Sequence, residues 1–119
     1  MSLSTDQYAI GHKALLEVLR GWDLAENPSE PAWENARNQF ASWFERLKDE
    51  GWTRKDVYRV VREVLDERPI RFSISTLDDL ANFESGLTGY CEPKSIVRFP
   101  NEPSDENQLA DYVRGNRWR

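Results

Sequence analysis

Three carboxylates in the middle of the chain stand at a spacing that could hold a metal ion. Glu63, Asp66 and Glu67 follow one another at i, i+3 and i+4, which places them on one side of a helix. Arg59 and Arg62 lie among them at the i, i+4 spacing of helical ion pairs. Because those arginines satisfy the same carboxylates, the pattern favours a solvated helix face, and we expect no metal site.

His12 and Cys91 are the only histidine and the only cysteine of the chain. A thiol nucleophile needs a base to activate it, and His12 is the one imidazole that could serve. No known catalytic motif surrounds either residue, and the two alone cannot build an ordinary zinc site. We therefore expect no catalytic residue, no cofactor and no enzymatic activity, with Cys91 acting as a small buried apolar residue.

A basic ridge is expected on the helix that carries the three carboxylates. Lys55, Arg59 and Arg62 project from the face opposite a stripe of valines, and such a ridge could contact phosphates. Asp66 shares the ridge and dilutes its charge. The tail, residues 112–119, adds three arginines around a tryptophan. Ridge and tail together support an alternative function, a helical regulator or adaptor that contacts nucleic acid or another protein.

Acidic residues dominate the second half of the chain. Residues 72–113 carry eight acids and two bases, a net charge of −6, and the stretch from Asp23 to Glu34 adds four acids and no base. Such a surface complements a basic partner. Trp118 lies beyond the last predicted helix, where it either folds back into the core or serves as a contact anchor. We predict one acidic contact region with these partner-binding residues: Asp78, Asp79, Glu84, Glu92, Glu102 and Trp118.

The N-terminal half is expected to form two amphipathic helices. Ser4 caps the first helix and Gln7, three residues later, completes a capping box. This helix ends near residues 21–23. Ser29 caps the second helix, which ends at Gly51. In both helices apolar residues recur at spacings of three and four, so each has one face for a core.

A third helix over residues 54–67 is the clearest feature of the pattern. Thr53 is its expected cap, and Asp56 stands three residues later. The apolar positions follow i, i+3, i+4, i+7 and i+8 without the alternation of a strand, which indicates a helix despite the valines. The predicted buried stripe consists of Val57, Val60, Val61, Val64 and Leu65.

Two more helices are predicted in the second half of the chain. The fourth begins at Ser75 or Thr76, and the fifth is capped by Ser104 and ends at Gly115. Between them lies a proline-rich connector near residues 90–103. Helices joined by loops predict an all-α fold, a single-domain bundle of four to five helices.

The connector has residues that could hold it in place. Gly89 can accept a left-handed turn at the end of the fourth helix. Tyr90, Ile96, Val97 and Phe99 supply apolar side chains, which we expect to pin the connector to the bundle. A loop held rigidly on a scaffold is also a suitable place for recognition.

Length and composition bound the class of protein and its compartment. With 119 residues and 14 aromatic side chains, a single folded domain over residues 1–119 is expected. The net charge of −5 opposes unselective binding to nucleic acid.

One cysteine allows no internal disulfide, which fits a reducing compartment. The N-terminus lacks a secretory pattern and no segment is long and apolar enough for a bilayer, so we expect a cytoplasmic protein without membrane contact.

The segment LDDLANFESGLTGYCEP, residues 77–93, resembles the helix and turn of helical immunity proteins, which bacteria make against their own colicins and contact-dependent toxins. The resemblance covers one helix and its exit, and the chain is also similar to that family in being small, acidic and helical. It implies inhibition of a cognate toxin domain, commonly a basic nuclease, by an acidic surface. The partner-binding residues named above come from the charge pattern and not from this resemblance.

Three hypotheses therefore stand in order. The first is an immunity-type inhibitor that blocks a basic toxin or nuclease domain. The second is the nucleic-acid or protein adaptor that uses the basic ridge and the tail. The third is an enzyme that uses Cys91 or the acidic clusters, for which the sequence names no substrate class.

Overall fold

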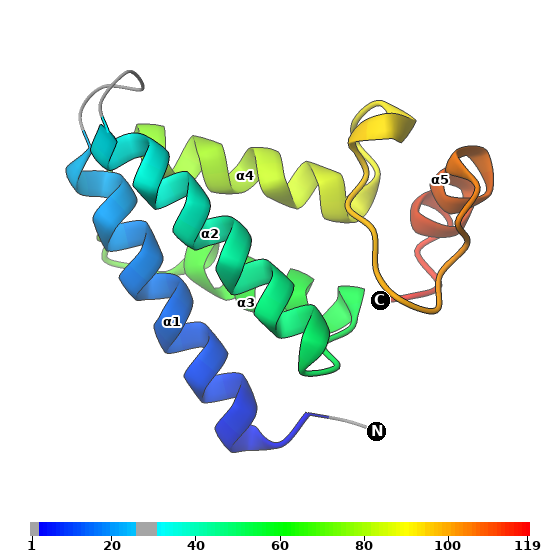
Figure 1. Ribbon diagram of the computed structural model, residues 1–119, viewed down its shortest axis with the longest axis horizontal. Helices are drawn as coiled ribbons and strands as arrows, with labels where there is room; N and C mark the ends of the chain where they lie inside the picture. Colours follow the sequence, from blue (N-terminus) through cyan, green and yellow to red (C-terminus); the bar gives the residue numbers. More distant parts are fainter. Residues whose placement is uncertain (1–2, 26–30) are drawn as a thin grey trace.

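Five α-helices make up the fold in the computed structural model, which describes residues 3–25 and 31–119 (Figure 1). No β-strand occurs within those two ranges. The predicted all-α bundle is therefore confirmed. The helices are α1 (Thr5–Leu24), α2 (Pro31–Asp49), α3 (Arg54–Asp66), α4 (Ile74–Thr88) and α5 (Glu106–Arg114), with a short 3-10 turn at Pro93–Ser95.

The first two helices form an antiparallel pair, α4 contacts both α1 and α3, and α5 contacts α4 and the 3-10 turn (Figure 1). α3 lies behind α2 in this view, and α4 runs across one end of the pair. The connector after α4 leads away to α5 on the far side. None of the described helices is both long enough and apolar enough to cross a bilayer.

The valine stripe of α3 lies at the centre of the main core. Val57, Val60 and Val61 are completely buried, and Val64 is nearly so. The predicted stripe is thus confirmed for these four residues, while Leu65 is only half-buried at its edge. Around it four phenylalanines from α2, α4 and the connector meet edge to face, with ring centroids 4.9–5.4 Å apart in successive pairs. They are Phe40, Phe83, Phe44 and Phe99.

A glycine allows α1 to approach the core closely. A Cβ atom built on Gly11 would lie 2.4 Å from Cζ2 of Trp52, a distance that no side chain tolerates. The Gly11 carbonyl also accepts a hydrogen bond of 3.0 Å from Nε1 of Trp43. Trp52 is itself buried and stacks on the ring of Tyr8 at 5.5 Å. The indole of Trp52 therefore belongs to the core and not to the surface.

The predicted capping box at Ser4 and the predicted cap at Thr53 are both confirmed. Ser4 and Gln7 exchange hydrogen bonds at the start of α1, and Thr53 and Asp56 do the same at the start of α3. α1 runs on to Leu24, past the predicted end, and α3 ends at Asp66, one residue before the predicted end. The predicted cap of the second helix, Ser29, lies outside the described residues, as do Glu26 and Glu30 of the acidic loop.

α4 begins at Ile74, one or two residues before the predicted start at Ser75 or Thr76. Ser73 is the cap, and its hydroxyl accepts a hydrogen bond from the Thr76 backbone N–H. The reason lies in α1, where the Asp23 carboxylate accepts hydrogen bonds from the Ser73 N–H at 2.7 Å and from the Thr76 hydroxyl at 2.9 Å. This contact spans about 50 residues of sequence, so local pattern does not reveal it.

The cap of α5 also differs from the prediction by one residue. Asp105, not Ser104, accepts the hydrogen bond from the Gln108 N–H. The end of α4 follows the prediction, because Gly89 has a φ of 87° and takes the left-handed conformation. Gly115 ends α5 as expected.

The connector is held to the bundle by fewer residues than predicted. Ile96 and Phe99 are buried and Val97 is half-buried, whereas Tyr90 is 82% exposed and contributes no packing of this kind. Ile96 joins a second, smaller core cluster beneath α5. The buried members of that cluster are Ile96, Leu109, Ala110, Val113 and Trp118.

Candidate functional site

The predicted partner-binding residues do not form one continuous surface. Asp78 and Asp79 are exposed near the start of α4, and Glu92 is exposed just beyond its other end. A helix of 15 residues separates its two ends by about 20 Å. Glu92 also pairs with Lys94 at 3.3 Å. The single acidic region predicted from the sequence is therefore divided between two ends of α4.

Glu102 faces inward and forms a buried ion pair. Its carboxylate accepts hydrogen bonds from Nε and Nη2 of Arg54 at 3.2 and 2.9 Å. The Arg54 side chain is 1% exposed and that of Glu102 is 9% exposed. In the free protein Glu102 is thus occupied by an internal cation, which corrects the expectation that it lies on an exposed contact surface.

Arg54, the first residue of α3, connects this helix to the end of α4 and to the connector. Its Nη1 donates to the carbonyl oxygen of Leu87 at 2.9 Å, in the last turn of α4, and its Nη2 donates to that of Val97 in the connector. The guanidinium also lies 4.9 Å from the ring centroid of Phe99. The sequence did offer one signal, because a cation at the first position of a helix opposes the helix dipole and so requires another reason to be there.

Trp118 folds back into the core, so it is not an exposed anchor. It is 8% exposed, and its Nε1 donates a hydrogen bond of 2.8 Å to the Val113 carbonyl. Its ring meets that of Tyr58 edge to face at 5.4 Å. The expectation of a contact anchor is corrected, and the alternative interpretation, a tryptophan that closes the core, describes its position.

Glu84 is half-buried and already has a cationic neighbour. Its two carboxylate oxygens accept hydrogen bonds of 3.0 and 3.2 Å from Nη1 of Arg62. Arg62 also pairs with Asp66 on its own helix. Of the six predicted residues, Asp78 and Asp79 are therefore the two carboxylates that are exposed and make no ion pair with another described residue.

These two aspartates belong to a surface that we call the acidic end, formed where α1 finishes and α4 begins (Figure 1). Leu24 is 77% exposed there, and Ile74 is 78% exposed. Ile74 and Asp78 are i, i+4 neighbours on α4, so an apolar and an acidic side chain stand next to each other. The acidic end consists of Leu24, Ile74, Asp78 and Asp79, together with the pocket described next.

A pocket of about 360 Å³, which we call the α1–α4 pocket, opens in the acidic end. Trp22 and Trp33 provide its aromatic walls, with ring centroids 5.6 Å apart at an angle of 58°. Asp79 accepts a hydrogen bond of 2.8 Å from Nε1 of Trp22, which fixes that indole. The residues lining the pocket are Trp22, Asp23, Ala25, Trp33, Ser73, Ser75, Thr76 and Asp79.

Asp23 is the second carboxylate of the α1–α4 pocket. The hydrogen bond from the Ser73 backbone N–H lowers its pKa, and the Thr76 hydroxyl adds to this effect. Asp23 is therefore ionised at neutral pH. Sequence reasoning counted Asp23 only as part of an acidic loop and did not recognise its pairing with α4.

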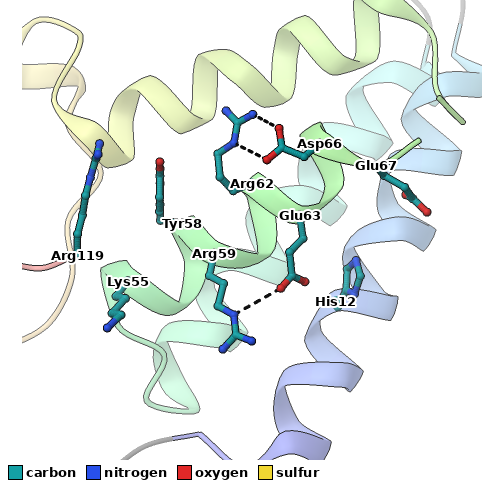
Figure 2. A pocket seen from close by; sticks show the side chains of 9 residues that line it. All are labelled: His12, Lys55, Tyr58, Arg59, Arg62, Glu63, Asp66, Glu67 and Arg119. Atoms are coloured by element: carbon teal, nitrogen blue, oxygen red, sulfur yellow. Dashed lines mark hydrogen bonds and ion pairs between the residues drawn. The ribbon is translucent and has the colours of Figure 1, made fainter. Parts of the chain in front are cut away.

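A second pocket, of about 610 Å³, lies over the outer face of α3, and we call it the α3 pocket (Figure 2). His12 of α1 borders it on one side and Arg119 of the tail on another. The predicted i, i+4 pairs are present, since Arg59 Nε lies 3.4 Å from Glu63 Oε1 and Arg62 pairs with Asp66. The hydrogen bond from Arg62 lowers the pKa of Asp66, so most charge along this face is balanced locally.

The basic ridge and the tail meet in the α3 pocket. Lys55 and Arg119 both line it, and neither makes an ion pair with any residue in the described part of the chain. The Arg119 guanidinium carbon lies 5.0 Å from the ring centroid of Tyr58 and 5.3 Å from that of Trp118. The pocket is thus basic and aromatic at the tail and acidic toward the end of α3.

His12 and Cys91 lie in different surroundings. His12 is half-buried and lines the α3 pocket, whereas Cys91 is half-buried beside the smaller core cluster. Burial raises the pKa of the Cys91 thiol, which favours the protonated, less nucleophilic form. The positive charge of Arg114 acts in the opposite direction, but burial has the larger effect on this pKa.

Comparison with protein-family models, with curated proteins and with solved structures finds no match to this chain.

Proposed function

We propose that this protein is an immunity-type inhibitor, which binds and blocks a basic toxin or nuclease domain through its acidic end. One observation carries the proposal. The acidic end combines exposed apolar side chains, Leu24 and Ile74, with two exposed aspartates that no described basic residue neutralises.

Both components have a role in binding a basic protein. Exposed apolar side chains supply the contact area that is removed from water in a complex. Unbalanced carboxylates attract a basic surface and raise the rate of association. Elsewhere on α4 and in the connector, Glu84 and Glu102 are paired with arginines, so the acidic end is the better-placed surface.

The resemblance to immunity proteins supports the class of partner and does not locate the contact surface. The segment that carries it, residues 77–93, includes Asp78 and Asp79 at one end of α4 and Glu92 beyond the other. A cognate toxin is thus the partner class that we favour, and the gene beside that of the inhibitor is the natural place to seek it.

Growth protection tests this function. The chain is expressed together with the toxin domain encoded directly upstream of its gene in the native host, and survival is measured. We expect protection by the wild type and by Ile10→Ser, but a clear loss with Ile74→Ser. Ile10 is a matched control because it is also an exposed isoleucine, at 59% against 78% for Ile74.

Two results would reject the proposal: the absence of both a complex and protection with the wild-type chain, or equal protection by the two serine variants. Thermal unfolding of both variants ensures that a loss of protection does not arise from misfolding.

A second candidate function, binding of nucleic acid, is favoured by the meeting of Lys55, Tyr58 and Arg119 in the α3 pocket. A base could stack on an aromatic ring while the cations contact phosphates. Binding of a single-stranded oligonucleotide should then weaken steeply with salt and be lost in Lys55→Glu. The net charge of −5 and the internal pairs of Arg59 and Arg62 make this the weaker candidate.

A further inference from the structure

We propose that the α1–α4 pocket binds the guanidinium group of an arginine side chain. This inference rests on the proposed function, because the arginine would come from the basic partner that the acidic end contacts. The geometry that carries it is the combination of two tryptophan rings and two carboxylates around one pocket of about 360 Å³.

The aromatic walls suit a planar cation. Trp22 and Trp33 are tilted against each other at 58°, and tryptophan is the aromatic residue that attracts cations most strongly. Within the same protein the guanidinium carbon of Arg37 lies 5.0 Å from the Trp33 ring centroid. Arg37 is an i, i+4 neighbour of Trp33 on α2 and does not line the pocket, so this contact leaves the site unfilled.

The two carboxylates each have an oxygen to offer. Asp23 uses Oδ1 for Ser73 and Thr76, and Asp79 uses Oδ2 for the Trp22 indole. Among the described residues, no hydrogen bond reaches the other oxygen of either carboxylate. These hydrogen bonds orient both groups and, within the described residues, leave one oxygen of each carboxylate as an acceptor. A guanidinium has donors for two carboxylates at once.

Among the residues that the structure describes, no basic side chain lines the pocket to compete with a ligand. Apart from the tryptophans and aspartates, its lining consists of alanine, serine and threonine residues. Its volume falls in the range of about 300–1,000 Å³ that is usual for ligand pockets. An arginine fits this set better than a lysine, because the planar guanidinium can stack on a ring and also donate to carboxylates.

A titration with N-acetyl-arginine amide, followed by the indole N–H signals in NMR spectra, tests the proposal. The Trp22 signal is a direct reporter, since this N–H donates to Asp79. We expect saturable shifts of the Trp22 and Trp33 signals with the arginine compound. N-acetyl-citrulline amide, which has the same shape without the charge, should cause none.

Two variants and one control locate the site. Asp79→Asn keeps an acceptor for Trp22 and removes the charge, and Trp33→Leu removes one wall. Each should weaken binding of the arginine compound at least tenfold. Glu92→Gln removes a charge at the other end of α4 and should leave binding unchanged. If Trp33→Leu fails to fold, Asp79→Asn decides alone.

Three results would overturn the proposal: no saturable shift, equal shifts with the citrulline compound, or wild-type binding by Asp79→Asn. The test separates this inference from the proposed function. Arginine binding in a chain that protects against no toxin would uphold the pocket and reject the function. Protection that depends on Ile74 without arginine binding would uphold the function and reject the pocket.

Discussion

Arg54 holds together several segments of the C-terminal half of the structure. Its side chain is 1% exposed and contacts Glu102, the end of α4 and the connector. Its guanidinium carbon also lies 5.9 Å from the ring centroid of Trp118. A buried cation is tolerated only when its donors are satisfied, so the segments that provide the acceptors are held in place together.

We predict that Arg54→Met strongly destabilises the fold. The substitution leaves the Glu102 carboxylate without its cation and several carbonyl oxygens without a donor. Removal of one partner from a buried pair costs about 3–5 kcal/mol. The measurement is the free energy of unfolding in urea.

Arg59→Met is the matched control on the same helix. The Arg59 side chain is 68% exposed and pairs with Glu63 at the surface, where an ion pair contributes about 0–1 kcal/mol. Equal stability of the two methionine variants would show that Arg54 does not hold the segments together.

The lowered pKa of Asp23 predicts how the stability of the protein depends on pH. This pKa is lowered in the folded protein by the hydrogen bond from Ser73. As the pH falls, the unfolded chain therefore takes up a proton at Asp23 at a higher pH than the folded chain does. Between these two pKa values the free energy of unfolding rises with pH. The contribution of Asp23 is fully present above the ordinary aspartate pKa of about 3.9 and is lost as the pH falls through the folded pKa.

We expect wild type to be more stable than Asp23→Asn at pH 6, with a difference that shrinks as the pH falls below about 4. Asparagine can still accept a hydrogen bond from Ser73, so the variant isolates the effect of charge. Thermal melts at several pH values provide the measurement. A difference that stays constant across this range would mean that the charge of Asp23 plays no part in holding α4.

Helix α1 contains two glycines with opposite effects on stability. Gly11 faces Trp52 so closely that a Cβ atom would lie 2.4 Å from its ring, whereas the nearest atom to a Cβ on Gly21 would be 3.9 Å away. The first glycine permits close packing. The second has no such role and lowers the helix propensity of α1.

We predict that Gly11→Ala destabilises the protein and that Gly21→Ala stabilises it. Overpacking costs about 1–3 kcal/mol, which exceeds the gain of about 1 kcal/mol in helix propensity. At Gly21 only the gain remains. Chemical denaturation of the two variants gives the comparison, and stabilisation by both substitutions would contradict the packing assigned to Gly11.

The elements were predictable where their signals are local. The caps at Ser4 and Thr53 depend on residues three positions apart, and the structure confirms both. The start of α4 was missed because Asp23, about 50 residues earlier, accepts hydrogen bonds from Ser73 and Thr76. Tertiary hydrogen bonds of this kind leave no mark in the local pattern.

For the molecule as a whole, the sequence predicted the sign of the surface charge but not which acidic residues lie exposed. Glu102 pairs with Arg54 across 48 residues, and Glu84 pairs with Arg62 across 22. Neither pairing follows from helical spacing. The sequence allows two interpretations of Trp118, because the environment of this residue depends on where the tail folds. The proposal of a basic partner comes from charge counts, whereas tertiary contacts decide which acidic side chains remain exposed and without an ion pair.

We propose that the acidic end, and not net charge, recognises a basic partner. The test is the rate of association with the proposed partner, a toxin domain encoded beside the gene, measured at low and high salt for Asp78→Lys and Glu92→Lys. Both substitutions change the net charge equally. Both residues are exposed, Asp78 near the start of α4 and Glu92 beyond its end. We predict that Asp78→Lys slows association at low salt and that salt reduces the difference. Wild-type rates for Asp78→Lys, or equal slowing by both variants, would contradict the claim.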